Sequence, residues 1–422
     1  MKYKNNVFDK FWGILYTGCN KGNDKMKLKE LEKEEYIDFT NKNNAHFLQS
    51  YEWGQLSKKR GYIPYYLGMY DDNKLVATAL LLKKNLFLGY SYFYIPRGFT
   101  IDYKDFSLLK EFTIILKEFL KKEKSIFCRI DPDIKLHTID ENANPIDGEN
   151  NYKLVSYLES IGYKHRTLTY FFETMQPRFT FRIDLNKSEE ELNKNYSQMV
   201  RHHIKRATKY GIEVLEGNKD LIQEFVRLMK LTEKRQDFFS HEDKFYYDFY
   251  DIFKDHLTIL LASINLNDVV SYLDSEIEKN DERKEKLILE KEKYLELLKS
   301  HEKYYVSGYY MVTYGNKSWY LYGANDMDFK NLYGNYKLFD YQIKKAKSLG
   351  SEIFDEFGTV GKPNSNSNLV GLHEFKRKWG GEYTEFIGEF DLVLNKLMYF
   401  LYTKLIPIYH KIVNRRLKKG VK

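Results

Sequence analysis

Hydrophobic and polar positions follow two periods along the 422-residue chain, and the alternation between these periods predicts its helices and strands. Apolar runs at residues 63–70 and 75–85 flank a polar turn, which predicts a β-hairpin. Residues 106–124 repeat apolar positions every three or four residues, which predicts an amphipathic helix. With a last strand at residues 166–173, the elements between residues 26 and 170 predict one α/β domain.

The same order of elements returns later, so residues 171–395 predict a second domain of the same plan. We therefore predict a mixed α/β (α+β) protein built by internal duplication. Residues 187–211 predict one helix that opens with a capping box of Ser188 and Glu191. Residues 268–303 interrupt the second domain with two charged helices that share a thin apolar seam. They predict an antiparallel coiled-coil arm, which is either a solvated excursion or a binding arm.

The two ends of the chain differ from this plan. Residues 1–25 lack clear periodicity and precede a second methionine, Met26, so we interpret them as an N-terminal extension. Residues 396–422 combine apolar positions with lysine and arginine, which predicts a basic amphipathic C-terminal helix. That helix either packs on the first domain or also lies against anionic lipid.

One stretch near the C-terminal end has the clearest local organisation. Ile353–Phe357 predicts a short strand that carries two carboxylates, and Gly358 allows the chain to turn away from the sheet. Gly371–Lys378 predicts one or two helical turns with a cluster of basic residues. Tyr383–Phe390 alternates like a returning strand. This arrangement predicts a place where a cationic group is held over a cleft.

Composition limits the function classes only moderately. The chain has 68 Lys+Arg against 60 Asp+Glu, a net charge of +8, which is compatible with nucleic acid or an anionic membrane but requires neither. Cys19 and Cys128 provide neither a metal-binding spacing nor a disulfide framework. No apolar run approaches the roughly 20 residues of a membrane span. We expect a cytoplasmic protein without a metal, with peripheral attachment to the inner face of the membrane still open.

Several segments after Met26 occur in a specific order and spacing. They are FLQSYEWGQL, YIPRGF, FCRIDP, MVRHHIKRATKYGIEV, SWYLYGAND, YKLFDYQIKKAKSLG and GLHEFKRKWGGEYTEFIGEFDLVL. With them, the chain resembles the FemABX family of aminoacyltransferases, which use aminoacyl-tRNA to extend the peptide side branch of peptidoglycan precursors. The resemblance implies two GNAT-like acyltransferase domains with an inserted helical arm. It also implies no cofactor, because aminoacyl-tRNA is the co-substrate.

The resemblance implies that a peptide amine attacks the ester carbonyl of aminoacyl-tRNA. This reaction needs alignment of the two substrates and stabilisation of the oxyanion that forms. Phe375 and Lys376 match a Phe-Lys pair beside the ester, so Lys376 is the expected oxyanion stabiliser. The alternative is that Lys376 is one of three surface cations on a helix. Asp131 ends a buried strand in an Arg-x-Asp-Pro motif, where it either accepts a proton or orients the amine, or caps the Pro132 turn.

Five further residues are expected to bind substrate, although the match is uneven. Arg97 and Tyr322 align with cleft positions of the family. The family has a lysine near the position of Trp53, and in this chain that lysine is shifted to Lys58. The family also has an arginine that this chain lacks, and His241 is the residue nearest to its position. Trp53 and Tyr322 are otherwise ordinary core aromatics. These departures favour lipid II over the soluble UDP-MurNAc-pentapeptide as acceptor.

A basic helix is the expected tRNA-binding element. Its cations are Arg201, Lys205, Arg206 and Lys209, which either contact phosphates of the acceptor stem or form a solvated helix face.

We therefore expect transfer of glycine, alanine or serine from aminoacyl-tRNA to a peptidoglycan precursor. The alternatives are a non-catalytic tRNA-binding scaffold and a GNAT-like transferase that acts on another amine. Association into homo- or hetero-oligomers, for which the arm is a candidate, is left open.

Overall fold

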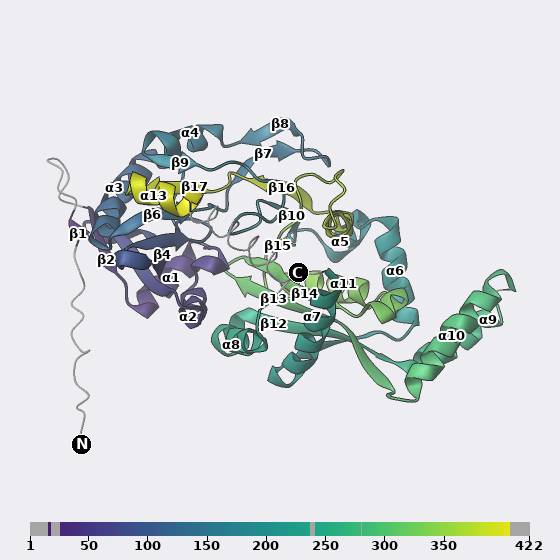
Figure 1. Ribbon diagram of the computed structural model, residues 1–422. Coiled ribbons are helices and arrows are strands. Elements are labelled where there is room, and N and C mark those ends of the chain that lie inside the picture. Colours follow the sequence, from purple (N-terminus) through teal and green to yellow (C-terminus); the bar gives the residue numbers. More distant parts are fainter. Residues whose placement is uncertain (1–15, 18–25, 237–240, 280, 406–422) are drawn as a thin grey trace, which may run out of the picture. The chain divides into compact units, whose positions relative to one another are not determined.

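The computed structural model describes residues 16–17, 26–236, 241–279 and 281–405 (Figure 1). These residues divide into two compact units. The first unit comprises the chain up to His137, Glu149–Leu168 and the chain from Phe386, and the second comprises Thr138–Gly148 and Thr169–Glu385. The expected second domain, residues 171–395, differs from the observed unit at its end, because the strand after Phe386 pairs within the first unit.

An eight-stranded sheet organises the first unit in the order β1-β2-β3-β4-β5-β6-β17-β9. All neighbours are antiparallel except β5 and β6, which are parallel and joined by α3. The strands are β1 (Tyr16–Thr17), β2 (Met26–Glu30), β3 (Ile63–Asp71), β4 (Lys74–Asn85), β5 (Ser91–Ile95), β6 (Ser125–Ile130), β17 (Phe390–Val393) and β9 (Tyr163–His165). The helices are α1 (Lys33–Lys42), η1 (Phe47–Gln49), α2 (Tyr51–Lys59), η2 (Phe87–Gly89), α3 (Phe106–Lys122), α4 (Tyr152–Ser160), α13 (Lys396–Phe400) and η8 (Leu401–Leu405).

The periodicity of α3 explains how this sheet is covered. Leu109, Phe112, Leu116 and Leu120 are three or four residues apart, so they lie on one face of the helix. All four are fully buried against the sheet in one hydrophobic cluster. The predicted helix and the predicted hairpin of β3 and β4 are therefore confirmed.

A nine-stranded sheet in the order β11-β12-β13-β14-β15-β10-β16-β7-β8 organises the second unit, to which residues 138–148 of β7 and β8 belong. The strands are β11 (Glu213–Gly217), β12 (Leu257–Asn265), β13 (Lys303–Tyr314), β14 (Lys317–Asn325), β15 (Ile353–Asp355), β10 (Phe179–Asp184), β16 (Glu382–Phe386), β7 (Lys135–Ile139) and β8 (Pro145–Asn150). The helices are α5 (Glu189–Asn195), α6 (Gln198–Lys209), η3 (Lys219–Leu221), α7 (Ile222–Gln236), α8 (Asp243–Phe253), η4 (Lys254–His256), α9 (Leu266–Ile277), η5 (Asp281–Arg283), α10 (Lys284–Leu298), η6 (Met327–Leu332), α11 (Gly334–Ser348), α12 (Val370–Lys376) and η7 (Arg377–Trp379).

Both units share one plan. In the first, antiparallel β3, β4 and β5 lead through α3 to β6, which is parallel to β5. In the second, antiparallel β12, β13 and β14 lead through α11 to β15, which is parallel to β14. The predicted fold class, a mixed α/β protein with two units of similar order, is confirmed.

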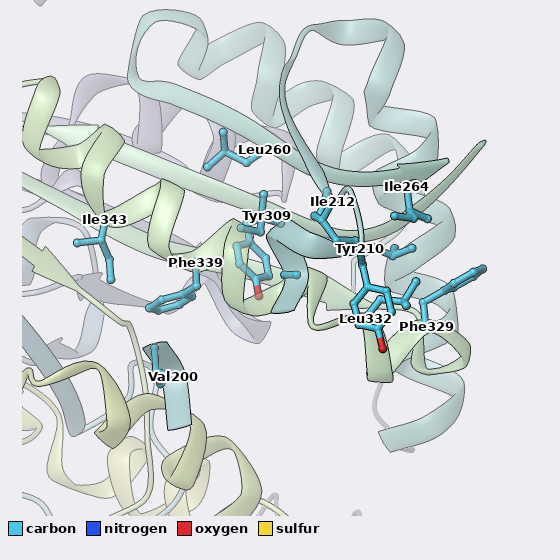
Figure 2. Packing of buried hydrophobic residues seen from close by; sticks show 14 of the residues in the cluster. Val200, Tyr210, Ile212, Leu260, Ile264, Tyr309, Phe329, Leu332, Phe339 and Ile343 are labelled. Carbon is cyan, nitrogen blue, oxygen red and sulfur yellow. The ribbon is translucent and has the colours of Figure 1, made fainter. Parts of the chain in front are cut away.

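The core of the second unit extends from the sheet to the segment that carries Lys376. Figure 2 shows Val200 of α6, Tyr309 of β13 and Phe339 of α11 among its side chains. The Phe339 ring lies 4.6 Å from the Trp379 ring and 5.3 Å from the Phe375 ring, measured between centroids. Because Phe375 and Trp379 flank Lys376, this packing positions the lysine.

Three expected elements differ from the structure. The helix expected at residues 187–211 is divided into α5 and α6, because Tyr196 is extended and Ser197 caps α6. Its capping box of Ser188 and Glu191 is confirmed. The strand expected at Tyr383–Phe390 is divided into β16 and β17 around Gly388, whose φ is +87°.

The strand expected at residues 166–173 is wrong, because β9 ends at His165 and the following residues form no strand. The structure also contains β8, which hydrophobicity does not reveal because every residue of this strand is exposed.

The helices α9 and α10 occupy the position of the expected arm, residues 268–303, and pack against each other. At the C-terminal end, α13 and η8 cover residues 396–405; the rest of the expected C-terminal helix and nearly all of residues 1–25 lie outside the described residues. Within the described ranges, no helix combines the length and the apolar character that a membrane crossing requires.

Candidate active site

The turn after β15 brings three backbone carbonyls together in the second unit. It is fixed to β10 by hydrogen bonds from the Glu356 N–H, at 2.9 Å, and the Thr359 N–H, at 2.8 Å, to carbonyls of that strand. Phe357 and Gly358 both have left-handed backbone angles, with φ of +47° and +77°. Because this conformation is costly for a residue with a side chain, the surrounding contacts must hold the turn in place.

Lys376, the last residue of α12, closes this turn. Its Nζ donates hydrogen bonds to the carbonyls of Glu356, of Phe357 at 2.7 Å and of Gly358 at 2.7 Å. An ammonium has three donors, so all of them are occupied. The residue is 2% exposed. Burial lowers its pKa to about 8, although the charges of Glu356 and Asp355 act to raise it. The interpretation of Lys376 as a surface cation is therefore wrong.

Glu356 is a buried carboxylate beside this lysine, and sequence reasoning did not select it. The residue is fully buried, and neither carboxylate oxygen has a hydrogen-bond partner among the described residues. Burial raises its pKa well above the usual value, Lys376 opposes this shift and Asp355 adds to it. Lys376 and Glu356 are thus two buried ionisable groups whose charges interact without a hydrogen bond between their side chains. The signal in the sequence that could have identified Glu356 is the pair of adjacent acidic residues, Asp355 and Glu356, shortly before Gly358.

The neighbouring Asp355 contrasts with Glu356, because its carboxylate is well bonded. It accepts hydrogen bonds from the Thr180 hydroxyl at 2.6 Å, the Arg182 Nε at 2.8 Å and the Phe357 N–H at 2.9 Å. Asp355 therefore joins β15, β10 and the turn.

Phe375 packs into the protein interior. Its ring centroid lies 5.4 Å from that of Tyr336 and 5.8 Å from that of Trp379. On the other side, the Lys376 Nζ lies 5.3 Å from the centroid of the Tyr320 ring. The Phe-Lys pair thus combines an anchor in the core with a buried cation.

Tyr322 and His241, both expected to bind substrate, lie together in the second unit. The His241 Nε2 and the Tyr322 hydroxyl are 3.2 Å apart, within hydrogen-bond distance. The Phe245 ring packs against both, with centroid distances of 3.8 Å to His241 and 6.0 Å to Tyr322. The structure therefore brings these two candidates into one aromatic group.

In the first unit, Asp131 and Arg97 meet at the ends of the parallel strands β5 and β6. The Asp131 carboxylate accepts hydrogen bonds from the Tyr94 hydroxyl at 2.9 Å and the Arg97 N–H at 2.7 Å. Arg97 has a left-handed φ of +58°, and its guanidinium lies 4.5 Å from the centre of the Phe386 ring. Burial raises the pKa of Asp131 to about 7, although Arg97 and Tyr94 oppose the shift. The carboxylate therefore joins the two strand ends.

The other candidates of the first unit lie on α2. Trp53 is buried and packs edge-on against Phe47, with ring centroids 5.8 Å apart. Lys58 is exposed in the last turn of the helix, and Ser57 beside it is buried. The structure therefore brings Arg97 and Asp131 into contact with each other, and it places Trp53 and Lys58 on a separate helix of the same unit.

The cations expected to bind tRNA lie on α6 and fall into two kinds. Arg201 donates hydrogen bonds to carbonyls at the end of α5, including that of Lys194 at 3.1 Å. Arg206 donates to the hydroxyls of Tyr333 at 3.2 Å and Tyr210 at 2.8 Å. Both arginines therefore support the fold.

Lys205 and Lys209 form the second kind. Both side chains are exposed, so they are accessible to a phosphate. A small cavity of about 130 Å³ lies beside Lys209, between α6 and the arm. Within the described ranges, no group of three metal-ligating side chains occurs.

Comparison with known proteins places the chain in a family. The model of the FemAB family matches residues 31–304 and 290–406, which is nearly the whole sequence. The chain therefore belongs to the FemAB family, as the resemblance predicts.

Similar proteins cover almost the full length of the chain. A protein named lipid II:glycine glycyltransferase from Staphylococcus epidermidis is 28% identical over 407 residues, covering 89% of this chain and 95% of that protein. A protein of the same name from Staphylococcus aureus is 28% identical over 433 residues, covering 94% and 100%. The crystal structure of FemX superimposes with a TM-score of 0.75 at 25% identity, covering 89% of this chain and 99% of FemX. The match to FemX supports the predicted fold class over 89% of this chain.

The environment of Asp131 predicts an unusual pH dependence of stability. Its pKa in the folded protein is about 7, above the ordinary 3.8, so the folded state binds the proton more tightly than the unfolded state. The stabilisation is complete at low pH and is lost as the pH rises from 3.8 to 7. Asp131→Asn can bond Tyr94 and Arg97 as the protonated acid does. Relative to wild type, the variant should gain about 1.4 kcal/mol of unfolding free energy per pH unit in this range.

Urea unfolding at pH 5, 6 and 7 measures this difference. Asp147→Asn, at an exposed position of β8, is the matched control for removing a carboxylate. A stability difference between Asp131→Asn and wild type that stays constant from pH 5 to 7 would contradict the assignment.

Proposed function

We propose that this chain transfers an aminoacyl group, with glycine favoured over alanine and serine, from aminoacyl-tRNA to an amine on the peptide branch of lipid II. The observation that carries the proposal is the match with two lipid II:glycine glycyltransferases over 89% and 94% of this chain. The match to the family model, over residues 31–304 and 290–406, includes both units and the segment with Lys376. The localisation follows as cytoplasmic, at the membrane face where a lipid-linked acceptor is found.

The reaction requires few chemical groups from the protein. The amine nitrogen forms a bond to the ester carbonyl carbon, the bond from that carbon to the ribose oxygen breaks, and the ribose hydroxyl leaves with a proton. Converting an ester to an amide is favourable, so the protein mainly has to align the substrates and stabilise the oxyanion. No cofactor is needed in this scheme.

Lys376 is the proposed oxyanion stabiliser. It is a buried cation, and charge acts more strongly where water is excluded. Because its three donors are occupied by carbonyls, an oxyanion at Nζ would replace one of them. We assign the replaced carbonyl to Phe357, because the left-handed backbone of this residue makes it a strained part of the turn.

Glu356 supports this role by keeping the lysine charged. Burial alone would favour the neutral amine, and the nearby carboxylate raises the pKa of Lys376 against that effect. The pair is therefore proposed to act as a unit in which Lys376 contacts the reacting group. Tyr322 and His241 are proposed to bind the acceptor, and Asp131 with Arg97 is proposed to contact substrate at the ends of β5 and β6.

A variant series at the pair tests the proposal. Lys376→Met should lower transfer by about 10²-fold to 10³-fold, because an oxyanion donor is lost. It should also cost about 3–5 kcal/mol of stability, because three backbone carbonyls lose their donor and Glu356 loses the opposing charge of Lys376. The double variant Glu356→Leu with Lys376→Met removes both charges and should regain much of that stability while transfer stays low. The measurements are single-turnover transfer and thermal unfolding.

The assay uses glycyl-, alanyl- and seryl-tRNA as donors, and lipid II and UDP-MurNAc-pentapeptide as acceptors. Glycine transfer to lipid II is the expected result. If the double variant regains transfer together with stability, Lys376 is only structural. Absence of transfer in every combination supports the scaffold alternative, and transfer to an unrelated amine supports the other transferase alternative.

A second series tests tRNA binding by α6. Lys205→Glu with Lys209→Glu should weaken aminoacyl-tRNA binding and flatten its salt dependence, since each lost phosphate contact reduces the log–log slope by roughly 0.7–0.9. Filter binding between about 50 and 200 mM salt measures both effects. The matched control is Lys244→Glu with Lys299→Glu, two exposed lysines elsewhere in the second unit. If both pairs behave alike, α6 is only a solvated helix face.

A further inference from the structure

The loop between β4 and β5 exposes large apolar side chains. Phe87 and Leu88 lie in η2, and they are 46% and 84% exposed. Leu88 has a left-handed φ of +55°, a conformation that glycine adopts easily and leucine rarely does. An exposed leucine at a strained position contributes nothing to the core, so the reason for it lies outside the fold.

The helix α13 and the following η8 expose a second apolar group. Leu397 is 69% exposed, Phe400 is 52% exposed and Leu405 is 44% exposed. In the same segment, Met398 and Tyr399 are buried and hold the helix on the first unit. The segment therefore has one apolar face directed inward and a second one directed to solvent.

A hydrophobic cluster joins these two groups. Met398 and Tyr399 pack with Phe127 of β6, and Leu86 and Tyr90, which flank η2, pack against the same cluster. The base of the loop and the inner face of α13 thus share one support. Figure 1 shows α13 beside strand β6 of this unit, with which it is in contact.

A cavity beside α13 adds positive charge to this region. Its volume is about 460 Å³, and its lining includes Lys164, Lys396 and Lys404. No carboxylate of the described residues forms an ion pair with these three lysines. The carboxylates of Glu389 and Asp391 nearby are already bonded, since Arg129 and Arg166 each contact both of them. An anion entering the cavity would therefore meet uncompensated cations.

We propose that this loop–helix surface, formed by Phe87, Leu88, Leu397, Phe400 and the three lysines of the cavity, docks on an anionic lipid bilayer. The apolar side chains would enter the interface, and the lysines would lie at the level of the phosphates. Apolar tips from two segments combined with lysines match a bilayer surface, which offers apolar chains below negative charge. The cavity takes the phosphate of one anionic lipid headgroup.

This surface explains how a protein that acts on a lipid-linked acceptor reaches it, but it does not depend on the transfer reaction. Binding to vesicles that contain no peptidoglycan precursor tests the surface alone. A failure of the proposed function and a failure of this inference can therefore be distinguished.

The experiment is flotation of the full chain with vesicles of phosphatidylcholine, with or without about a third of phosphatidylglycerol. Wild type should float with the anionic vesicles, should not float with phosphatidylcholine alone, and should detach as salt is raised. Wild type that remains unbound with the anionic vesicles, or binds both kinds equally, overturns the proposal.

Two variants locate the surface. Leu88→Gly removes the side chain and relieves the left-handed strain, so vesicle binding should fall while the unfolding temperature stays equal or rises. Lys396→Glu with Lys404→Glu should reduce binding at least about tenfold. The controls are Leu289→Ser, at a 67% exposed leucine of α10, and Lys244→Glu with Lys299→Glu. Equal loss in test variants and controls would overturn the assignment to this surface.

A spectroscopic measurement gives an independent answer. A tryptophan introduced as Leu88→Trp should show a blue shift of its emission on addition of anionic vesicles, because it enters the interface. The same change at Leu289 should show none. Emission of the Leu88→Trp protein that is unchanged by anionic vesicles would place the loop in water and contradict the proposal.

Discussion

The hydrogen bonds between the Lys376 ammonium and three carbonyls of the turn after β15 are the constraint on which the candidate site depends. Two left-handed residues are needed to turn these carbonyls toward one point. A buried cation without such partners would carry a large desolvation cost. The core packing of Phe375 and Trp379, the strained turn and the buried Glu356 therefore all relate to one ammonium group.

The two units position a buried aspartate with a similar arrangement of strands and helices. Each has a parallel strand that returns through a helix, and each places a buried aspartate at the end of that strand. Asp131 joins the ends of β5 and β6, whereas Asp355 joins β15 to β10 and to the turn. The shared plan positions two chemically different groups. These are the Asp131 carboxyl, whose pKa is raised, and the Lys376 ammonium, whose pKa is lowered.

Much of the fold could be predicted from the sequence because periodicity survives in its long elements. The repeat of α3, the β3–β4 hairpin and the capping box of α5 all follow local rules. The division of residues 383–390 into β16 and β17 could not be predicted, because it depends on which strands are available as neighbours. The same holds for β8, which has no buried face.

The candidate site was predictable in part. The Phe-Lys pair identified Lys376, but sequence does not show that its charge is buried within a turn. Sequence reasoning did not select Glu356, because an acidic residue next to another is usually solvated. Only the fold shows that it is buried and that its carboxylate oxygens have no hydrogen-bond partner among the described residues. Arg201 and Arg206 were grouped with exposed lysines because charge patterns do not reveal which cations bond to the chain itself.

The ionisation of Lys376 itself can be measured, and it decides whether this residue is a buried cation. Protein labelled with ¹³C at lysine Cε is titrated by NMR, and the Lys376 signal is assigned by its absence in Lys376→Met. We expect the Lys376 ammonium to titrate near pH 8, well below the ordinary 10.5, and at a still lower pH in Glu356→Gln, where the supporting charge is gone. A titration near 10.5 that Glu356→Gln leaves unchanged would contradict the buried pair and the site built on it.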